Sequence, residues 1–271
     1  MKKYIKRMIK GAVRAMGYEI VNARFSLADY FFKPKDIIVN ESLMRVRKTI
    51  YEDSPSPMYR ESYHIHQIGA WGPLPSLVYM LGKTRSMAAP LRSLDIGCAF
   101  GTMAAFMSCL GYRVSAIDFV PLETYLGAKT RDKYNIDFHE TLIETENLPF
   151  APKTFDLITL TEVLEHFKYQ PLDTLKKIVE TLKDDGVFLM TTPALGAHWT
   201  AEAHDCPFEK IPSYQGEPID KKDRHWKIYD LKELQRLLEA AGLDAFVGLQ
   251  LNINTGAEGL YAVAVKRQRL P

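Results

Sequence analysis

Apolar residues from position 91 onwards follow two alternating patterns. Short, nearly continuous apolar runs predict buried strands at 92–98, 112–119, 136–144, 155–162 and 186–193. Helical spacing or a closing glycine marks the stretches between them, at 102–111, at 121–134, and from 163 to the KDDG turn at 183–186, the last interrupted near Pro171. Strict alternation of strand and helix predicts a parallel sheet with helices on both faces.

The last part of the chain departs from this alternation. Residues 229–242 predict a helix with Asp230 as N-cap and Gly242 as C-cap, and the strand-like runs LDAFVGLQLN and GLYAVAVKR follow it directly. Two consecutive strands predict a hairpin. The expected fold is therefore α/β, a doubly wound, mostly parallel seven-stranded sheet with a C-terminal antiparallel hairpin and a polar, aromatic insertion at 194–228.

A partly helical extension is expected to precede this sheet. Residues 2–16 have the spacing of an amphipathic helix that ends at Gly17. Residues 25–90 mix aromatic residues with the proline pairs SPSP and GPLP, which predicts a cap or accessory layer that is helical in pieces at best. Three regions follow from this: a basic amphipathic helix at 1–24, the accessory layer at 25–90, and the main domain at 91–271.

Charge separates the ends of the chain from its interior. The 271 residues carry a formal net charge of +2, but residues 1–24 hold seven basic residues against Glu19 alone, and 266–271 hold three more, leaving −7 between them. A basic amphipathic helix favours weak peripheral contact with an anionic membrane surface, and a solvated helix or a homodimer contact is the alternative. No apolar run reaches the roughly 18 to 20 residues of a membrane span.

Cysteines and the first residues indicate a cytoplasmic location, at the inner face of the cytoplasmic membrane if the helix binds there. The chain has three cysteines and no CxxC pair, which fits a reducing compartment. Basic residues recur through position 14, so the apolar core of a signal peptide is missing. The near-neutral overall charge argues against nucleic acid as a partner.

Candidate chemistry lies where the first two strands of the main domain end. Asp95, Gly97 and Gly101 form a glycine-rich turn before a helix whose free N–H groups suit an anion such as a carboxylate. Asp118 ends the next strand and can accept hydrogen bonds from a ribose diol. The glycines have GxxxG spacing, not the GxGxxG of dinucleotide sites, and Asp95 would repel a pyrophosphate. The alternative is that these residues bind no ligand and form only a tight turn followed by a helix N-cap.

These motifs together resemble the class I S-adenosylmethionine-dependent methyltransferases, in particular the small-molecule group with the ubiquinone-pathway O-methyltransferases. LDIGCAFG, ETENLPFAPKTFDLITLTEVLEHF and GVFLMTTP carry the resemblance, over about 91–265. It implies S-adenosylmethionine as cofactor, with the methionine part at the first motif, the ribose at the acid of the second strand, and the adenine beside the following turn. The residues so implied are Asp95, Gly97, Cys98, Ala99, Gly101, Asp118, Phe119, Glu144, Thr145, Leu160, Thr161 and Glu162. Ala99 replaces the motif's middle glycine, and Glu144 replaces its usual Asp.

The segment EVLEHF presents a candidate metal site. Glu162, Glu165 and His166 are spaced i, i+3 and i+4, which places them on one face if the segment is a helix, and two carboxylates and an imidazole suit a divalent ion. The resemblance implies metal binding at these positions in the ubiquinone-type enzymes. The alternative is that His166 packs over the sheet edge.

The insertion supplies candidates for a general base, since a histidine suits proton transfer near neutral pH. The candidates are His198, His204 and His225, with Asp205 beside them. Aromatic residues of the same region would stack on a sugar or ring, or simply pin the loop to the core: Trp199, Phe208, Tyr214, Trp226 and Tyr229. Tyr63, His64 and His66 of the accessory layer are further candidates for residues at the opening of the site.

These observations predict a methyltransferase that acts on a hydroxyl by in-line transfer. The place after the fourth strand reads TEVL and lacks the Pro-Pro-aromatic motif of enzymes that methylate nucleobase amines. The N-terminal segment is similar to the starts of methyltransferases of bacterial surface-polysaccharide pathways, so the expected acceptor is a sugar in a glycan or a nucleotide-linked precursor. The alternatives are a quinone or phenolic O-methyltransferase and a catalytically silent S-adenosylmethionine-binding protein.

Overall fold

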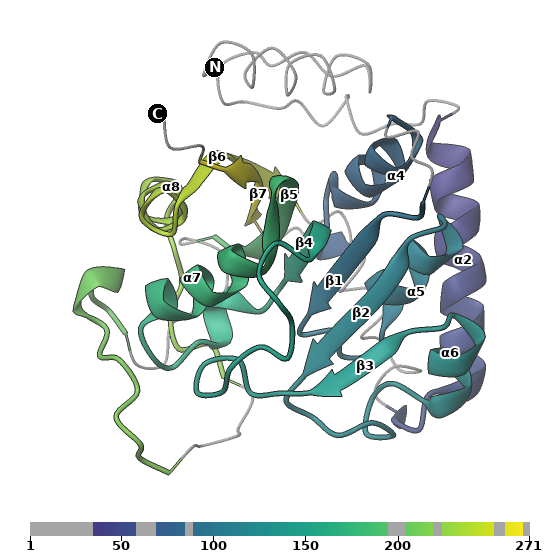
Figure 1. Cartoon of the computed structure of the whole chain (residues 1–271), viewed down its shortest axis with the longest axis horizontal. Helices are drawn as coiled ribbons and strands as arrows, with labels where there is room; N and C mark the ends of the chain where they lie inside the picture. The colour runs from purple at the N-terminus through teal and green to yellow at the C-terminus, as the bar shows by residue number, and fades with distance from the viewer. Residues whose placement is uncertain are drawn as a thin grey trace.

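A computed structural model describes residues 35–57, 69–84, 89–194, 204–218, 224–251 and 258–267. Within them seven strands form one sheet in the order β3-β2-β1-β4-β5-β7-β6 (Figure 1). The strands are β1 (Arg92–Ile96), β2 (Arg113–Asp118), β3 (Asp137–Glu140), β4 (Phe155–Thr161), β5 (Leu182–Pro193), β6 (Leu243–Leu251) and β7 (Glu258–Lys266). The predicted helix at 2–16 lies outside the described residues.

Pairing in the sheet confirms the expected fold class. The first five strands are all parallel to their neighbours. Strand β7 lies antiparallel between β5 and β6, so the predicted hairpin forms one edge of the sheet. The chain order reverses between β1 and β4, and in parallel sheets this switch point creates a crevice at the carboxyl ends of the strands.

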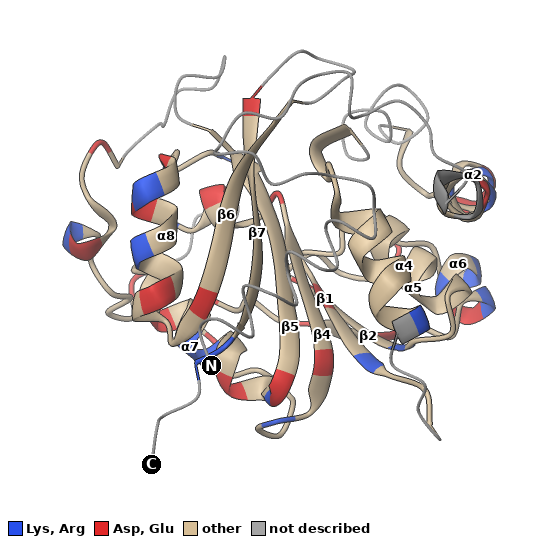
Figure 2. Cartoon of the chain, turned by 90° about the horizontal axis from the view of Figure 1, so that it is seen from above, with Lys and Arg blue, Asp and Glu red and all other residues tan. Residues whose placement is uncertain are grey.

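Helices cover the sheet on both faces (Figures 1 and 2). One face carries α2 (Lys35–Asp53), α4 (Leu74–Thr84), α5 (Thr102–Cys109) and α6 (Ala128–Lys133). The other face carries α7 (Pro171–Thr181) and α8 (Leu231–Ala240). Two short 3-10 turns complete the described part, η3 (Leu164–His166) after β4 and η4 (Phe208–Lys210) in the insertion.

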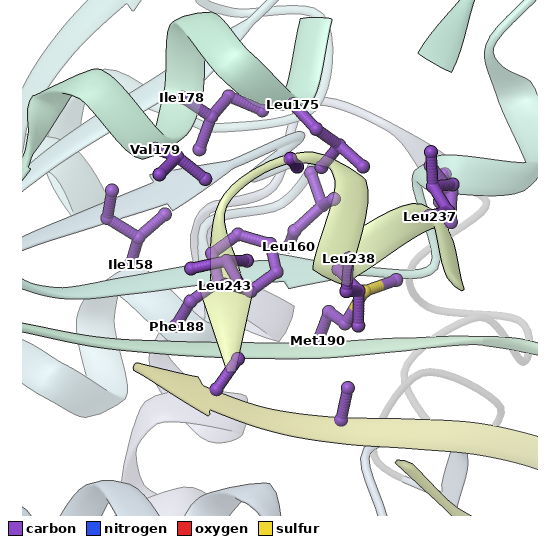
Figure 3. Close-up of a cluster of buried hydrophobic side chains, with 14 of the residues drawn as sticks. Ile158, Leu160, Leu175, Ile178, Val179, Phe188, Met190, Leu237, Leu238 and Leu243 are labelled. Carbon is purple, nitrogen blue, oxygen red and sulfur yellow. The ribbon is translucent and has the colours of Figure 1, made fainter. Parts of the chain in front are cut away.

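Each helical layer has its own apolar core against the sheet. Figure 3 shows the cluster under α7 and α8, where Leu175 and Ile178 meet Phe188 and Met190 of the sheet. The second cluster joins the helices of the opposite layer, with Val46, Trp71 and Phe106 among its fully buried side chains. Burial on both faces explains why the parallel strands are continuous apolar runs rather than alternating ones.

The accessory layer is more regular than the sequence analysis predicted. The layer consists of separate helices, as expected, but one of them, α2, runs without interruption for 19 residues. Val39, Leu43, Val46 and Ile50 repeat at helical spacing and are all buried. Charged residues between them obscured this pattern. The proline pairs lie outside the helix, SPSP directly after α2 and GPLP at the start of α4.

Three other predicted boundaries change. Helix α6 covers only Ala128–Lys133 of the expected 121–134, because Pro121 and Gly127 favour turns in the first half. Strand β3 ends at Glu140, four residues early. Pro171 does not interrupt a helix after β4; it begins α7, where its missing N–H needs no partner.

Charged residues lie mainly in the helices and toward the ends of the strands, as the colours in Figure 2 show. No helix of the described residues combines the length and the apolar character needed to cross a bilayer.

Replacing the N-cap of α8 tests the predicted capping. The Asp230 side chain accepts a hydrogen bond from the Glu233 N–H at 2.7 Å. We expect Asp230→Ala to lower the free energy of unfolding by about 1 kcal/mol. Lys232→Ala, an exposed change in the same helix, should stay within about 0.5 kcal/mol. Urea unfolding of both variants measures this, and equal stability would show that the cap is dispensable.

Candidate functional site

The turn after β1 has a backbone that glycine alone accepts without strain at two points. Gly97, Ala99 and Gly101 have φ values of 67°, 44° and 72°. A Cβ at Gly97 would lie 2.3 Å from Cγ2 of Val163, and one at Gly101 would lie 2.7 Å from Cδ1 of Leu126. Ala99 adopts the left-handed region at a cost of roughly 1–2 kcal/mol. The turn is therefore strained and closely packed.

Asp118 holds this turn from the neighbouring strand. Its Oδ2 accepts a hydrogen bond from the Ala99 N–H at 2.8 Å, and its Oδ1 accepts one from the Val120 N–H at 3.0 Å. The carbonyl of Ile117 accepts two more, from the N–H groups of Gly97 and Cys98. Asp118 is buried, and as a carboxylate it can accept more hydrogen bonds than one for each oxygen. The two predicted motifs thus form one site.

Asp95 is buried beside Asp118 in the crevice. Its Oδ1 accepts a hydrogen bond from the Thr159 hydroxyl at 2.8 Å, across the β1–β4 pairing. Burial raises the pKa of Asp95 from 3.8 to about 7, and the charge of Asp118 adds to this, while the Thr159 hydrogen bond opposes it. A cation bound next to Asp95 would favour the ionised form of its carboxyl group.

The other residues of the first two motifs lie around this pair. Helix α5 begins directly after Gly101 and has no side-chain cap, and the backbone of Ala104 in its first turn hydrogen-bonds the Asp95 carboxylate. Burial and the charges of Asp118 and Asp95 hold the pKa of the Cys98 thiol well above its usual value, which makes a reactive thiolate unfavourable. Phe119 follows Asp118 at the rim and is half-buried.

Glu144 connects two loops at the same edge. Its Oε1 accepts a hydrogen bond from the Tyr169 N–H at 2.9 Å, and the Lys168 backbone also hydrogen-bonds this carboxylate. Burial raises the pKa of Glu144 to about 7. Thr145 turns back on its own loop, since its N–H and hydroxyl both donate to the Leu142 carbonyl.

The end of β4 divides into core and site residues. The side chain of Leu160 is fully buried in the core under α7 and α8 (Figure 3), so only its backbone remains for a ligand. Thr161 is buried as well. Glu162 adopts a left-handed backbone with φ 53°, and its N–H donates to the Thr191 carbonyl at 3.0 Å. Burial, together with the charge of Glu165, holds the pKa of Glu162 well above its usual value.

The predicted helix face of Glu162, Glu165 and His166 does not exist. Only the single turn η3 is helical there, and the left-handed Glu162 precedes it. The structure instead brings together Glu165, His166 and His225, whose ligand atoms all lie within 4.8 Å of one another. The two imidazole rings meet edge to face at 4.8 Å between centroids.

Hydrogen bonds define the state of His166. Its Nδ1 lies 2.9 Å from the Arg224 carbonyl, which can only accept, so this nitrogen carries a hydrogen. Its Nε2 then faces Oε1 of Glu165 at 3.6 Å, while Oε2 of Glu165 accepts from the Thr192 hydroxyl. A proton on Nε2 would form an ion pair with Glu165, and a bare Nε2 could bind a metal. Two imidazoles and one carboxylate suit a divalent transition metal.

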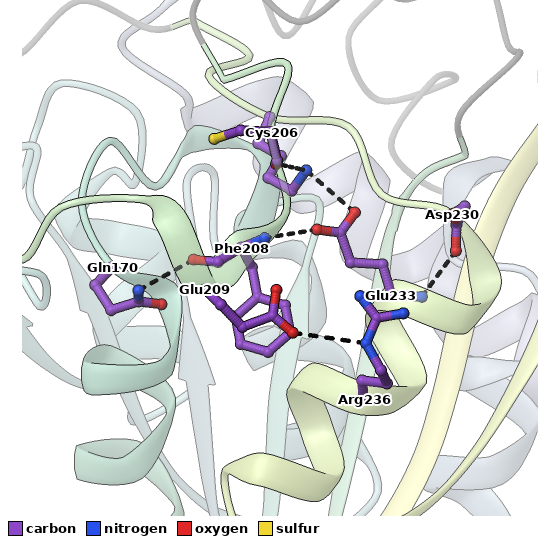
Figure 4. Close-up of polar contacts among 8 residues, drawn as sticks. Gln170, Cys206, Phe208, Glu209, Asp230, Glu233 and Arg236 are labelled. Atoms are coloured by element: carbon purple, nitrogen blue, oxygen red, sulfur yellow. Dashed lines mark hydrogen bonds and ion pairs between the residues drawn. The ribbon is translucent and has the colours of Figure 1, made fainter.

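Polar contacts fasten the insertion to α7 and α8 (Figure 4). The Gln170 side chain donates to the Phe208 and Ile211 carbonyls, at 3.0 and 2.9 Å. The Glu233 carboxylate accepts from the Phe208 N–H at 2.7 Å and pairs with Lys227 at 3.1 Å. The sequence analysis did not single out Gln170, Lys227 or Glu233; Gln170 stands directly before Pro171, where a helix N-cap could have been expected.

Lys227 and Glu233 are both buried, and this ion pair fixes the segment that carries His225. The Lys227 ammonium also donates to the Cys206 carbonyl at 2.8 Å. The Glu165 carbonyl accepts the Trp226 N–H at 2.8 Å and the Lys227 N–H at 3.2 Å, which docks the segment on η3.

The predicted bases of the insertion have different environments. His225 lies against His166 and is half-buried. His204 is a structural bridge, since its Nε2 donates to the Lys168 carbonyl at 2.8 Å and that nitrogen cannot take a proton. Asp205 is exposed. The remaining candidates, His198, Tyr63, His64 and His66, lie outside the described residues.

The aromatic residues mostly pin the insertion, as the alternative interpretation predicted. Phe208 and Tyr229 are buried in the core under α7 and α8. Tyr214 packs against Tyr169 with 5.1 Å between ring centroids. Trp226 is half-buried, with the Lys168 and Arg224 side chains over its ring, and Trp199 lies outside the described residues.

Val163 joins the two groups of residues into one site. Its side chain fills the space where Gly97 lacks a Cβ, and Glu162 and Glu165 stand on either side of it in the chain. The glycine-rich turn and the Glu165–His166–His225 group thus lie next to each other at the carboxyl edge of the sheet.

Comparison with known sequences agrees with this geometry. Residues 65–246 match the family model described as a methyltransferase domain. The ubiquinone biosynthesis O-methyltransferase of Schizosaccharomyces pombe is 30% identical over 115 residues, 41% of this chain and 40% of that protein. That of Methylocella silvestris is 40% identical over 92 residues, 31% of this chain and 35% of that protein. The chain spans less than half the length of these curated relatives.

Solved structures share the fold. A 1,6-didemethyltoxoflavin-N1-methyltransferase of Burkholderia thailandensis, solved with S-adenosylhomocysteine, superposes with a TM-score of 0.54 and 17% identity, over 93% of this chain and 99% of that chain. The [4+2]-cyclase SpnF superposes with a TM-score of 0.51 and 15% identity, over 72% of this chain and 82% of that one.

The sheet order, the braced glycine-rich turn and the family match over most of the chain agree with one another, and the chain belongs to the methyltransferase domain family.

Proposed function

We propose that the crevice between β1 and β4 binds S-adenosylmethionine. The observation that carries this is the buried Asp118 carboxylate, which braces the glycine-rich turn after β1 from the end of the next strand, where a carboxylate suits the ribose hydroxyls. The N-terminus of α5 suits the methionine carboxylate, and Asp95 suits the positive charges of the methionine part. The Glu144 carboxylate suits the adenine amine.

The reaction follows from the cofactor. S-adenosylmethionine bound here would supply an electrophilic methyl group on its sulfonium for in-line transfer to an acceptor oxygen, with the thioether as leaving group. The residues of this chain align the acceptor and take its proton. Orientation alone contributes on the order of 7 to 11 kcal/mol. His225 is our proposed base, because it is half-buried beside His166 and next to the turn that holds the cofactor.

Two acceptor classes remain, and each has its own support. A sugar hydroxyl of a glycan or nucleotide-linked precursor fits the polar rim of histidine, arginine, lysine and tryptophan side chains around His225. The relatives named as ubiquinone biosynthesis enzymes support a quinone or phenolic acceptor instead. Turnover with labelled S-adenosylmethionine on panels of sugar nucleotides and of catechols separates the two.

A shared fold does not by itself establish methyl transfer, since SpnF is named a cyclase. The chain would be a silent binder if it binds the cofactor tightly and no panel member is methylated. Assignment to surface-polysaccharide synthesis at the cytoplasmic membrane face rests on residues 1–24 and is tested separately by vesicle binding of the full chain.

Replacing the acid of β2 tests the cofactor site. Asp118→Asn loses one acceptor at the ribose position, and we expect it to weaken S-adenosylmethionine binding by about 10- to 100-fold. Glu140→Gln is the matched control, because Glu140 pairs with Asp118 in the sheet and is exposed. Calorimetry measures both. Unchanged affinity in Asp118→Asn, or tighter binding of NAD than of S-adenosylmethionine, would refute the site.

Protonation of Asp95 should couple to cofactor binding. With a pKa of about 7 in the empty protein, Asp95 is largely neutral at pH 6, and a bound cation ionises it with release of a proton. Affinity should therefore fall as the pH drops from 8 to 6, by up to about tenfold per unit.

Asp95→Asn provides the control, since the ligand's own amino group titrates equally in both proteins. Cofactor binding to the variant should release fewer protons, because the proton that Asp95 gives up in the native protein is missing. The number of protons released is measured by calorimetry in buffers of different ionisation heat. It should also be no less stable than the native protein above pH 7, because a raised pKa means that ionised Asp95 destabilises the empty fold. Identical proton release in both proteins would contradict this role.

Removing the proposed base should affect turnover alone. We expect His225→Ala to lower kcat by about 10² to 10⁴ with cofactor affinity unchanged. His139→Ala on β3 is the control histidine. If a chelator also abolishes native turnover and a divalent ion restores it, His225 acts as a metal ligand rather than as a base. If His225→Ala keeps the kcat of the native protein, His225 is neither the base nor a metal ligand needed for turnover.

A further inference from the structure

The end of helix α2 contacts the loop at 119–127, which follows Asp118. Asp53 is the last residue of α2, and its Oδ2 accepts two hydrogen bonds from Thr130 in the first turn of α6, one from the N–H and one from the hydroxyl, both at 2.6 Å. Gly127 permits this approach, because a Cβ there would lie 2.7 Å from the same oxygen and 2.9 Å from the Asp53 carbonyl oxygen. One carboxylate oxygen thus connects the accessory layer to the end of the loop.

Thr49 of α2 holds the other end of α6. Its hydroxyl oxygen accepts hydrogen bonds from the Lys133 ammonium at 2.9 Å and from the Tyr134 hydroxyl at 3.1 Å. Figures 1 and 2 show α6 lying beside α2. Thr130 is buried, so water cannot readily replace the Asp53 carboxylate as the partner of its hydroxyl. The contacts with α2 therefore fix α6 and, with it, the end of the loop.

The end of this loop packs on the glycine-rich turn. Leu126 is buried, and its Cδ1 would lie 2.7 Å from a Cβ at Gly101. The Tyr125 ring contacts the Phe100 ring, with 5.0 Å between centroids. Leu126 and Tyr125 stand within two residues of the glycine that contacts Asp53, so their position against the turn depends on that contact.

The conformation of the loop needs to be fixed from outside. Glu123 has φ 71°, a left-handed backbone that residues other than glycine rarely adopt. Pro121, Glu123 and Thr124 are exposed, so this part of the loop buries little surface of its own. A strained backbone persists only where its surroundings determine it. The two anchors are Asp118 at the start of the loop and Asp53 at its end.

We propose that Asp53 is a positioning residue of the cofactor site. By fixing the end of the loop, it holds Leu126 and Tyr125 against the glycine-rich turn, and the turn then has the conformation that receives S-adenosylmethionine before the cofactor binds. Such preorganisation reduces the entropy lost on binding. The role rests on the proposed cofactor binding. It gives α2 a part in cofactor affinity, although none of its residues is among those proposed to contact the cofactor.

The experiment measures S-adenosylmethionine binding to full-length variants by calorimetry. We expect Asp53→Ala to weaken binding about tenfold, because the loop must then be ordered when the cofactor binds. Asp53→Asn keeps an oxygen that can accept both hydrogen bonds, so it should restore the affinity to within about threefold of the native value. Glu52→Gln changes the exposed neighbour of Asp53 and should bind the cofactor as the native protein does.

A buried substitution elsewhere in α2 separates positioning from stability. Leu43→Ala opens a cavity in the same helix, about 15 Å from Asp53 along the helix axis. It should lower the midpoint of urea unfolding more than Asp53→Ala does, and leave the cofactor affinity of the folded protein unchanged. Hydrogen exchange without cofactor gives a second readout: residues 97–101 and 119–127 should exchange faster in Asp53→Ala than in Leu43→Ala.

The outcomes decide between the two roles. Weaker binding in Asp53→Ala that Asp53→Asn restores and Leu43→Ala does not share supports the positioning role. Native affinity in Asp53→Ala, or equal losses in Asp53→Ala and Leu43→Ala, would overturn it. If Asp53→Ala does not fold, Thr130→Val takes its place, with an expected loss of about threefold because one of the two hydrogen bonds remains.

Failure of the proposed function is recognised separately. It shows as absence of S-adenosylmethionine binding in the native protein. Hydrogen exchange still tests the contact in that case, because faster exchange in Asp53→Ala alone would show that α2 braces the turn, and unchanged exchange would refute it.

Discussion

The site depends on the hydrogen bonds with which the end of β2 holds the turn after β1. Three residues of this turn have positive φ, and one of them, Ala99, is not a glycine. Such a backbone persists only where its surroundings fix it. The Ile117 carbonyl and the Asp118 carboxylate supply this constraint through three N–H groups of the turn. Because α5 starts where the turn ends, the same contacts set the direction of its first N–H groups.

The second half of the site is held by a different kind of interaction. The segment with His225 leads into the buried Ile228 and Tyr229, and before them the buried Lys227–Glu233 pair and the Glu165 carbonyl fix its path. A buried ion pair contributes little net stability, but removal of one partner costs about 3–5 kcal/mol because a charge stays buried. Here the Lys227–Glu233 pair holds the returning part of the insertion, which carries His225, in one position.

The sequence was sufficient for the sheet and for the first half of the site. Gly97, Gly101 and Asp118 stand at strand ends, and the carboxyl ends of parallel strands meet, so their proximity follows from the local pattern alone. The length of α2 was missed because charged residues lie between its buried positions. The contact between His166 and His225 could not be predicted, since it depends on the path of a long insertion whose anchors are side-chain to backbone hydrogen bonds.

The position of β7 has a consequence for the order in which the molecule is completed. This strand lies between β5 and β6 and is made last, from Glu258–Lys266. Until it leaves the ribosome, β6 has no partner in the sheet, and the core under α8 stays open to water. The core of the layer of α2, α4 and α5 is also completed by β7, because Tyr261 is buried in it. The turn after β1, Asp118 and α5 are nevertheless synthesised well before the segment that carries His225, and both helical layers gain their last apolar contacts only when β7 is in place.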